Sequence, residues 1–226
     1  MTGATQAAIS LKGICKSFGF RDVLQGVDLE VQGGACLCIY GQNGAGKSTL
    51  ARILATLWSP SQGTGEILGN ELGKGNGEIR RRSSMVADQS FLRSELTLEE
   101  NLSFYGSLYG TPEDGRSCDL LEKFGLFHRR KDPVSTFSQG MVKRANLARS
   151  LLHDPDLWIL DEPFSGLDQE GQELLKECIR EYPRSGRTVV LVTHLREIGD
   201  ELGTESVEIR DGYLSRGAGP EKGATP

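Results

Sequence analysis

Residues 41–49 read GQNGAGKST, which fits the spacing GxxxxGK followed by Ser or Thr of a phosphate-binding loop. The glycines would let backbone N–H groups turn inward around a phosphate, and a helix N-terminus favours negative charge. Lys47 would supply a positive charge at the β and γ phosphates, and the Ser48 hydroxyl suits a magnesium ion. The predicted phosphate site comprises Gly41, Gln42, Asn43, Gly44, Ala45, Gly46, Lys47, Ser48 and Thr49.

An acidic pair follows a second apolar run, in LWILDEP. A nucleotide site needs a carboxylate near magnesium and a group that activates water. Asp161 is expected to meet magnesium through water, and Glu162 to polarise the attacking water. Acid pairs at strand ends are common, but here a phosphate loop precedes the pair in the chain. We expect the two carboxylates to point in different directions at the end of a strand.

Short apolar segments are expected to carry these residues. VDLEV at 27–31 alternates apolar and acidic residues, which predicts a half-buried peripheral strand. ACLCIY at 35–40 is apolar throughout and predicts a central strand. LWIL at 157–160 and TVVLV at 188–192 also lack alternation, which is typical of parallel strands covered by helices on both faces. The order of segments indicates an α/β fold.

Helices are expected after the phosphate loop and between the two later strands. The first, over 47–57, would place Leu50, Ile53, Leu54 and Leu57 on one face. The second would carry Leu174, Leu175, Cys178 and Ile179.

The segment from about 91 to 152 shows helical periodicity and no convincing strand, so it predicts an inserted helical subdomain. One helix is expected to start at Thr97, with Glu100 completing a capping box, and to end at Gly110. Near the C-terminus, the Asp-Gly pair in VEIRDGYLS predicts a tight hairpin, and we expect residues 216–226 to form a flexible tail.

Composition argues against several other classes of protein. The 226 residues carry a formal net charge of −5, which argues against binding to a nucleic-acid backbone. No apolar run approaches the roughly 20 residues that span a bilayer, and the N-terminus lacks a leader pattern, so we expect a cytoplasmic protein. The five cysteines show no CxxC spacing and are expected to be buried free thiols.

Five stretches together resemble the ATP-binding cassette (ABC) family over nearly the whole chain: GQNGAGKST, Gln89 in MVADQSFL, FSQGMVKR, LWILDEPFSGLD and the histidine in LVTHL. The resemblance implies an α/β fold class, a P-loop NTPase (RecA-like) core with an antiparallel β subdomain and an inserted helical subdomain. The core would occupy about 8–90 and 153–215, and the helical subdomain about 91–152. ATP and Mg²⁺ are the implied cofactors.

In that family two cassettes enclose two ATP molecules, each between the phosphate loop of one subunit and the signature loop of the other. FSQGM at 137–141, here termed the signature segment, stands where the family has LSGGQ, and the resemblance assigns Ser138 and Gly140 to the γ-phosphate across the interface. Gln139 and Met141 depart from the pattern, and slower hydrolysis or weaker dimerisation is expected from them.

The resemblance also assigns roles to four other residues. Phe18 would stack on adenine, although an aromatic residue near a strand is more often part of a core. Gln89 would contact magnesium and join it to the helical subdomain, and His194 would hold the γ-phosphate and attacking water. Asp168 would communicate across the dimer, with a helix N-cap as the simpler alternative. Glu162, His194, Lys47 and Gln89 form the implied catalytic set, and Ser48, Gln89 and Asp161 the magnesium set.

The implied mechanism is ATP-driven dimer closure followed by hydrolysis, relayed to transmembrane permease subunits at the cytoplasmic face of the membrane. The region between Gln89 and Asn101 is expected to dock on these partners. The signature segment and its flank look like the ATPase subunit of haem exporters in cytochrome c maturation, and similar segments occur in drug, lipid and polysaccharide exporters. Two alternatives are a soluble cassette ATPase, for example in iron–sulfur cluster assembly, and a GTPase or small kinase, which the absence of an NKxD motif disfavours.

Overall fold

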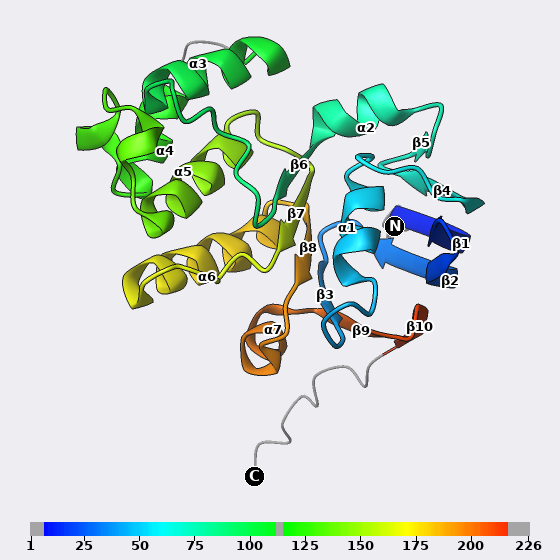
Figure 1. The fold of residues 1–226 in the computed structure, drawn as a ribbon. Helices are drawn as coiled ribbons and strands as arrows, with labels where there is room; N and C mark the ends of the chain where they lie inside the picture. Colours follow the sequence, from blue (N-terminus) through cyan, green and yellow to red (C-terminus); the bar gives the residue numbers. More distant parts are fainter. Residues whose placement is uncertain (1–6, 112–114, 217–226) are drawn as a thin grey trace, which may run out of the picture.

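The computed structural model describes residues 7–111 and 115–216. Its centre is a six-stranded sheet in the order β10-β9-β3-β8-β7-β6 (Figure 1). Neighbouring strands pair in parallel, except that β9 and β10 are antiparallel. The strands are β3 (Cys36–Tyr40), β6 (Ser83–Val86), β7 (Leu157–Asp161), β8 (Thr188–Val192), β9 (Glu205–Arg210) and β10 (Tyr213–Arg216).

Both faces of this sheet are covered, which confirms the expectation for its unalternated apolar strands. Trp158 and Leu160 of β7 face one buried cluster, and Leu157 and Ile159 of the same strand face the other. The first cluster includes apolar side chains of α5 (Gln139–Leu151), α6 (Gln169–Arg184) and α7 (Arg196–Leu202). The second includes side chains of α1 (Lys47–Leu54) and α2 (Asn76–Arg82).

A second, antiparallel sheet packs on the α1 side, in the order β2-β1-β4-β5. Its strands are β1 (Ala7–Phe18), β2 (Arg21–Gln32), β4 (Gln62–Ile67) and β5 (Asn70–Glu71). The predicted strand at 27–31 is part of β2 and lies at the edge of this sheet, so its peripheral position is confirmed. The antiparallel β subdomain implied by the resemblance is also confirmed.

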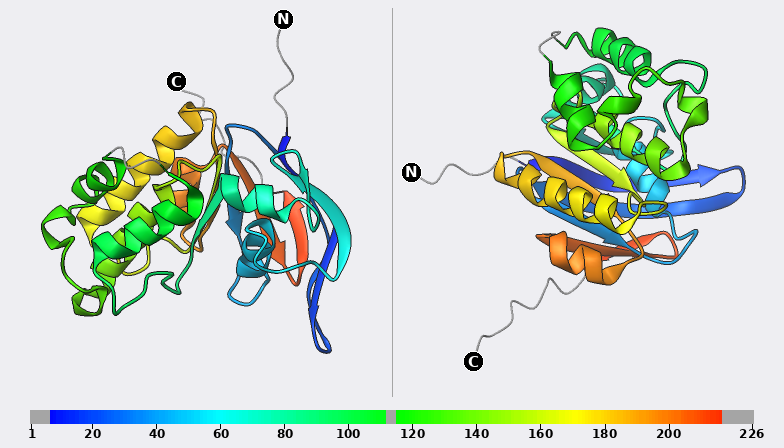
Figure 2. Two further views of the ribbon diagram at one scale, coloured as in Figure 1. Left: turned by 90° about the horizontal axis from the view of Figure 1, so that it is seen from above. Right: turned by 90° about the vertical axis from the view of Figure 1, so that its left-hand side faces the viewer.

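The helical subdomain lies on the opposite side of the central sheet from the antiparallel sheet (Figure 2). It contains α3 (Leu98–Tyr109), α4 (Arg116–Lys123), the 3₁₀ turns η1 (Phe127–Arg129) and η2 (Val134–Thr136), and α5. The capping box is confirmed, because the Thr97 amide donates to Glu100 Oε2 at 2.8 Å and the Glu100 amide donates to Thr97 Oγ1 at 3.2 Å. Gly110 ends α3 in the left-handed conformation at φ 66°.

The hairpin between β9 and β10 has the predicted turn. Asp211 and Gly212 have φ values of 50° and 82°, and two consecutive positive angles are characteristic of a type I′ turn.

Two expectations were wrong: that the helix after the phosphate loop extends to residue 57, and that all five cysteines are buried. The helix after the phosphate loop ends at Leu54, because Thr56 turns the chain at φ 55°, and Leu57 is consequently 49% exposed rather than part of the buried face. Cys36, Cys38 and Cys178 are buried, but Cys15 is partly exposed and Cys118 is exposed on α4. Of the predicted flexible tail, residues 217–226 lie outside the described residues, and Arg216 ends β10.

Candidate active site

The phosphate loop connects β3 to α1, as its spacing predicted. Gly41 and Gly46 have φ values of 146° and 111°, where side chains are strained. A Cβ at Gly41 would lie 2.3 Å from the Ile209 carbonyl oxygen, and one at Gly46 would lie 2.9 Å from that of Val23. These two glycines therefore permit both the turn and the close approach of β9 and β2.

Lys47 is the first residue of α1 and is buried. Its ammonium donates to the carbonyl oxygens of Gly41 at 2.7 Å and Gln42 at 3.0 Å. These bonds hold the charge against the loop, within the segment whose backbone amides would surround a phosphate.

Ser48 and Asp161 are brought together from α1 and from the end of β7. Ser48 Oγ donates to Asp161 Oδ1 at 3.0 Å. Burial raises the pKa of Asp161, and the hydrogen bond from Ser48 opposes that shift. A hydroxyl and a carboxylate oxygen are hard ligands of the kind that Mg²⁺ accepts, so this pair fits magnesium. Within residues 7–111 and 115–216, no group of three or more His, Cys, Asp or Glu could hold a metal, and waters or phosphates would complete the shell.

Glu162 follows Asp161 directly but points elsewhere, as predicted. It has φ 48°, a left-handed angle that is unfavourable for a non-glycine residue, and its amide donates to the Val192 carbonyl oxygen at 3.0 Å. Its Oε2 lies 2.9 Å from Nδ1 of His194, which follows β8. Adjacent parallel strands thus bring together a carboxylate and an imidazole separated by 32 positions.

Gln89 lies beyond β6 and is exposed, at the junction of the core and the helical subdomain. The residues after it are attached to that subdomain, because Tyr105 Oη donates to the Phe91 carbonyl oxygen at 2.6 Å and Asn146 Nδ2 donates to Ser90 Oγ at 2.9 Å. Within the described part of the chain, Gln89 makes no hydrogen bond with Ser48 or Asp161. The structure places it at the predicted junction and does not join it to the magnesium pair.

The signature segment begins α5. Ser138 caps the helix, and its Oγ accepts from the Met141 amide at 3.3 Å. Gln139 is the first helical residue and does not have a positive φ, so glutamine fits the backbone here. A Cβ at Gly140 would lie 3.1 Å from the Gly166 carbonyl oxygen, so there is little room for a larger side chain. Among the described residues, Ser138 has no hydrogen bond to the phosphate loop of its own chain.

Asp168 and Phe18 lie at the start of a helix and at the end of a strand. Asp168 caps α6, accepting from the Gly171 amide at 3.0 Å, as in the simpler of its two predicted roles. Phe18 ends β1 and is 44% exposed, so it is not a core residue. Its ring meets Trp58 edge-on at 5.0 Å, with the Lys16 ammonium 5.0 Å from the ring centre.

Lys143 also belongs to this site, although no sequence motif includes it. This lysine on α5 is buried and donates to the Glu162 carbonyl oxygen at 3.1 Å. A lysine five positions after Ser138 carries no motif, so no signal in the sequence pointed to this contact.

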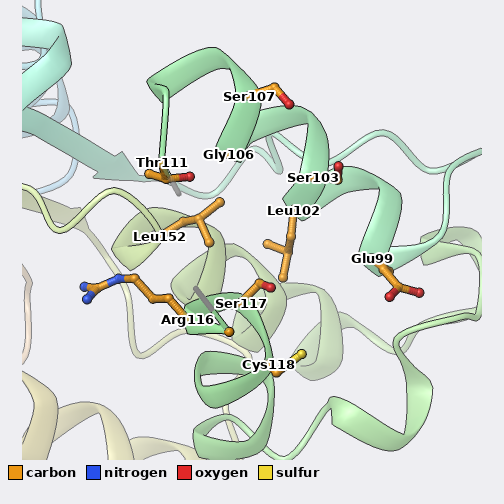
Figure 3. A pocket seen from close by; sticks show the side chains of 11 residues that line it. Glu99, Leu102, Ser103, Gly106, Ser107, Thr111, Arg116, Ser117, Cys118 and Leu152 are labelled. Carbon is orange, nitrogen blue, oxygen red and sulfur yellow. The ribbon is translucent and has the colours of Figure 1, made fainter. Parts of the chain in front are cut away.

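Two large hollows lie in different parts of the molecule. One of about 730 Å³ borders the phosphate loop, between the start of β2 and the β9–β10 hairpin. The other, of about 420 Å³, lies between α3 and α4, where Glu99, Ser103, Ser117 and Cys118 line it (Figure 3). None of the predicted site residues lines this second hollow.

Comparison with known proteins places this site in a family. The family model described as ABC transporter matches residues 24–165. The chain is 34% identical over 207 residues to a Nod factor export ATP-binding protein I of Ralstonia nicotianae, covering 90% of this chain and 64% of that protein. It is 35% identical over 210 residues to the daunorubicin/doxorubicin resistance ATP-binding protein of Streptomyces peucetius, covering 92% of this chain and 64% of that protein. The chain therefore spans slightly less than two thirds of the length of these relatives.

Solved structures share the fold. An ATP-binding subunit of an ABC transporter superposes with a TM-score of 0.87 at 30% identity, over 93% of this chain and 89% of that chain. A dimeric ATP-binding cassette in a post-hydrolysis state, bound to ADP and Pi, superposes with a TM-score of 0.86 at 25% identity, over 95% of this chain and all of that one. With its phosphate loop, acidic pair and histidine in one site, the chain belongs to the ABC transporter family and contains an ABC-type ATPase domain.

Proposed function

We propose that this chain binds ATP with Mg²⁺, hydrolyses it to ADP and phosphate, and powers an exporter whose membrane-spanning part is a partner protein. The observation that carries the proposal is the pairing of Ser48 with Asp161 and of His194 with Glu162 beside one phosphate loop. The first pair supplies oxygen ligands, and the second a carboxylate and an imidazole for water and the γ-phosphate.

In this proposal the phosphate loop and Lys47 bind the phosphates, with Phe18 stacking on the adenine. Magnesium, when bound through Ser48 and Asp161 with Gln89, would neutralise charge on the β and γ phosphates. Glu162 polarises the attacking water, and its contact with His194 orients both side chains. His194 is mostly exposed, so it can reach the γ-phosphate.

The second half of each site comes from a second cassette. Ser138 is exposed and caps a helix whose N-terminal dipole favours an anion, while it makes no hydrogen bond with the described phosphate loop of its own chain. We infer that Ser138 and Gly140 contact the γ-phosphate bound by the partner's loop, and that Asp168 lies at the interface. The dimeric cassette with ADP and Pi supports this arrangement.

The membrane partner is a separate protein in this proposal. In the part of the chain that the structure describes, no helix is both long enough and apolar enough to cross a bilayer. A hollow of about 160 Å³ beside the segment after Gln89 is lined by Leu57, Phe91 and Tyr105, and Leu57 is exposed. We propose that a cytoplasmic segment of a permease docks here, which places the chain at the cytoplasmic face of the membrane.

The cargo is proposed from the relatives. The matched proteins are named for Nod factor export and for resistance to daunorubicin and linearmycin, so we infer export of an organic compound. Haem export for cytochrome c biogenesis remains a prediction that these relatives do not support.

The test compares wild-type protein with Glu162→Gln. The variant should bind ATP and accumulate as an ATP-bound dimer in size-exclusion chromatography, while the rate of hydrolysis falls by about 100-fold or more, the usual contribution of a general base. Glu122→Gln, at an exposed position of α4, is the matched control and should hydrolyse ATP at the wild-type rate. An unchanged rate in Glu162→Gln would remove this residue as the group that polarises water.

Co-purification tests the partner. The Glu162→Gln protein, tagged and isolated with ATP from solubilised native membranes, should bring multi-span proteins with it. Recovery of soluble partners alone would favour the alternative of a soluble cassette ATPase.

A further inference from the structure

Lys143 lies on the second turn of α5, with only 9% of its side chain exposed. Burying an ammonium group is costly unless hydrogen bonds and opposite charges compensate it. Its Nζ donates to the Glu162 carbonyl oxygen at 3.1 Å and lies 3.8 Å from Asp88 Oδ1. Both compensating groups therefore belong to the site, one in the acidic pair and one beside Gln89.

Glu162 needs such support because its backbone is strained. A φ of 48° is unfavourable for glutamate, and such a conformation persists only where surrounding contacts determine it. Its amide is fixed by Val192 and its carboxylate is bonded to His194. Its carbonyl oxygen accepts from Lys143 Nζ at 3.1 Å and, at the longer distance of 3.4 Å, from the Ser165 amide. Lys143 therefore supplies the shorter of the two bonds that restrain this carbonyl.

A second contact joins α5 to the segment that follows Glu162. The α5 backbone at Gly140 comes so close to the Gly166 carbonyl oxygen that a Cβ there would lie 3.1 Å away. A hollow of about 300 Å³ opens beside this junction, lined by residues that include Asp88, Lys143, Ser165 and Gly166. Lys143 therefore joins α5 to the segment around Glu162 at the edge of this hollow.

We propose that Lys143 is a positioning residue that holds Glu162 in its strained conformation and ties it to the helix that starts at Ser138 in the same chain. The inference rests on the proposed function, in which Glu162 polarises the attacking water. Among the described residues, Lys143 has no hydrogen bond or ion pair with the phosphate loop, so its loss should slow hydrolysis without weakening the binding of ATP.

The test measures steady-state ATP hydrolysis for Lys143→Met and Lys143→Arg. Because small misplacement of a catalytic group has large effects on rate, we expect kcat to fall about tenfold in Lys143→Met, with KM for ATP within about twofold of wild type. Lys143→Arg keeps the charge and a donor and should recover to within about threefold of the wild-type kcat. If Lys143→Met does not fold, Lys143→Gln takes its place.

Lys176→Met is the matched control. Lys176 is also a poorly exposed helical lysine, paired with Glu173 at 2.9 Å and Glu201 at 3.3 Å, but it lies on α6 away from the site. It should keep the wild-type kcat. A wild-type kcat in Lys143→Met would overturn the role of Lys143, and so would a rise in KM as large as the fall in kcat. Neither result would overturn the proposed function. Absence of hydrolysis by the wild-type chain would instead overturn the proposed function and this inference with it.

Mixed dimers test whether Lys143 acts on its own chain. Lys143→Met paired with a Glu162→Gln chain should be about tenfold slower than wild type paired with Glu162→Gln, because its only competent Glu162 lacks the lysine. A chain that carries both substitutions, paired with wild type, should hydrolyse ATP at the reference rate, which is that of wild type paired with Glu162→Gln. A reference rate in the first mixture, with slowing in the second, would show that Lys143 acts across the interface and would refute the assignment.

Discussion

Acidification should lower the free energy of unfolding through protonation of His153, which follows α5 beside the core. Its ring stacks on Tyr109 with ring centres 3.8 Å apart and planes 5° apart. Nε2 lies 3.1 Å from the Ser83 carbonyl oxygen, so this nitrogen carries the hydrogen and donates. Burial lowers the pKa of His153 to about 4. The hydrogen bond to Ser83 and the charge of Asp154 oppose the shift, and the charges of Arg149 and Arg116 add to it.

The sign follows from proton binding. An unfolded histidine has a pKa of about 6.5, so between pH 6.5 and about 4 the unfolded chain binds more protons than the folded one. The free energy of unfolding must therefore fall as the pH falls through this window. A pKa difference of that size corresponds to about 3 kcal/mol of unfolding free energy. Because the ring is partly exposed to solvent, we expect a loss of about 2 kcal/mol.

Urea unfolding at a series of pH values between about 4.5 and 7 measures this loss. His153→Phe keeps a ring against Tyr109 but cannot titrate, so its free energy of unfolding should depend less steeply on pH than that of wild type. The raised pKa of Asp161 acts in the opposite direction and is common to both proteins. His128→Phe, at an exposed position, should keep the wild-type dependence. Equal slopes for wild type and His153→Phe would refute the reasoning.

Two other substitutions test the helix starts. Thr97→Ala removes one half of the capping box and should cost about 1 kcal/mol of unfolding free energy in urea titrations, whereas an unchanged midpoint would show that the cap adds nothing to α3. Ser138→Arg should leave ATP binding by the monomer intact and abolish the ATP-dependent dimer in size-exclusion chromatography, because it places bulk at the proposed γ-phosphate contact; normal dimer formation would contradict the assignment of the signature segment.

Local chemistry explains what could be predicted. The phosphate loop, the Thr97–Glu100 capping box and the Asp211–Gly212 turn each depend on residues within a few positions of one another. Their backbone angles and hydrogen bonds are specified by short-range sterics and side-chain type, so a short stretch of sequence is sufficient. The parallel strands were predictable for a related reason, because burial on both faces leaves a continuous apolar run.

Elements whose pattern is interrupted were not predicted in detail. The pairing of β1 with β2 shifts register between Leu11 and Ile14, and Gly13 and Gly26 have positive φ, so neither strand alternates regularly along its length. β6 begins with Ser83 and Ser84, two buried polar residues that do not form an apolar run. In each case, pairing with neighbouring strands outweighs the local pattern.

The sequence by itself determined the family resemblance and the residue types of the site, because a phosphate loop, an acidic pair and a histidine need particular side chains at particular spacings. The tertiary structure alone decided which groups surround them. It brought His194 to Glu162 across neighbouring strands, and it buried Lys143 against the Glu162 carbonyl oxygen. A lysine on a helix resembles any solvated residue in sequence, and only the packing of distant segments determines which charge or carbonyl it meets.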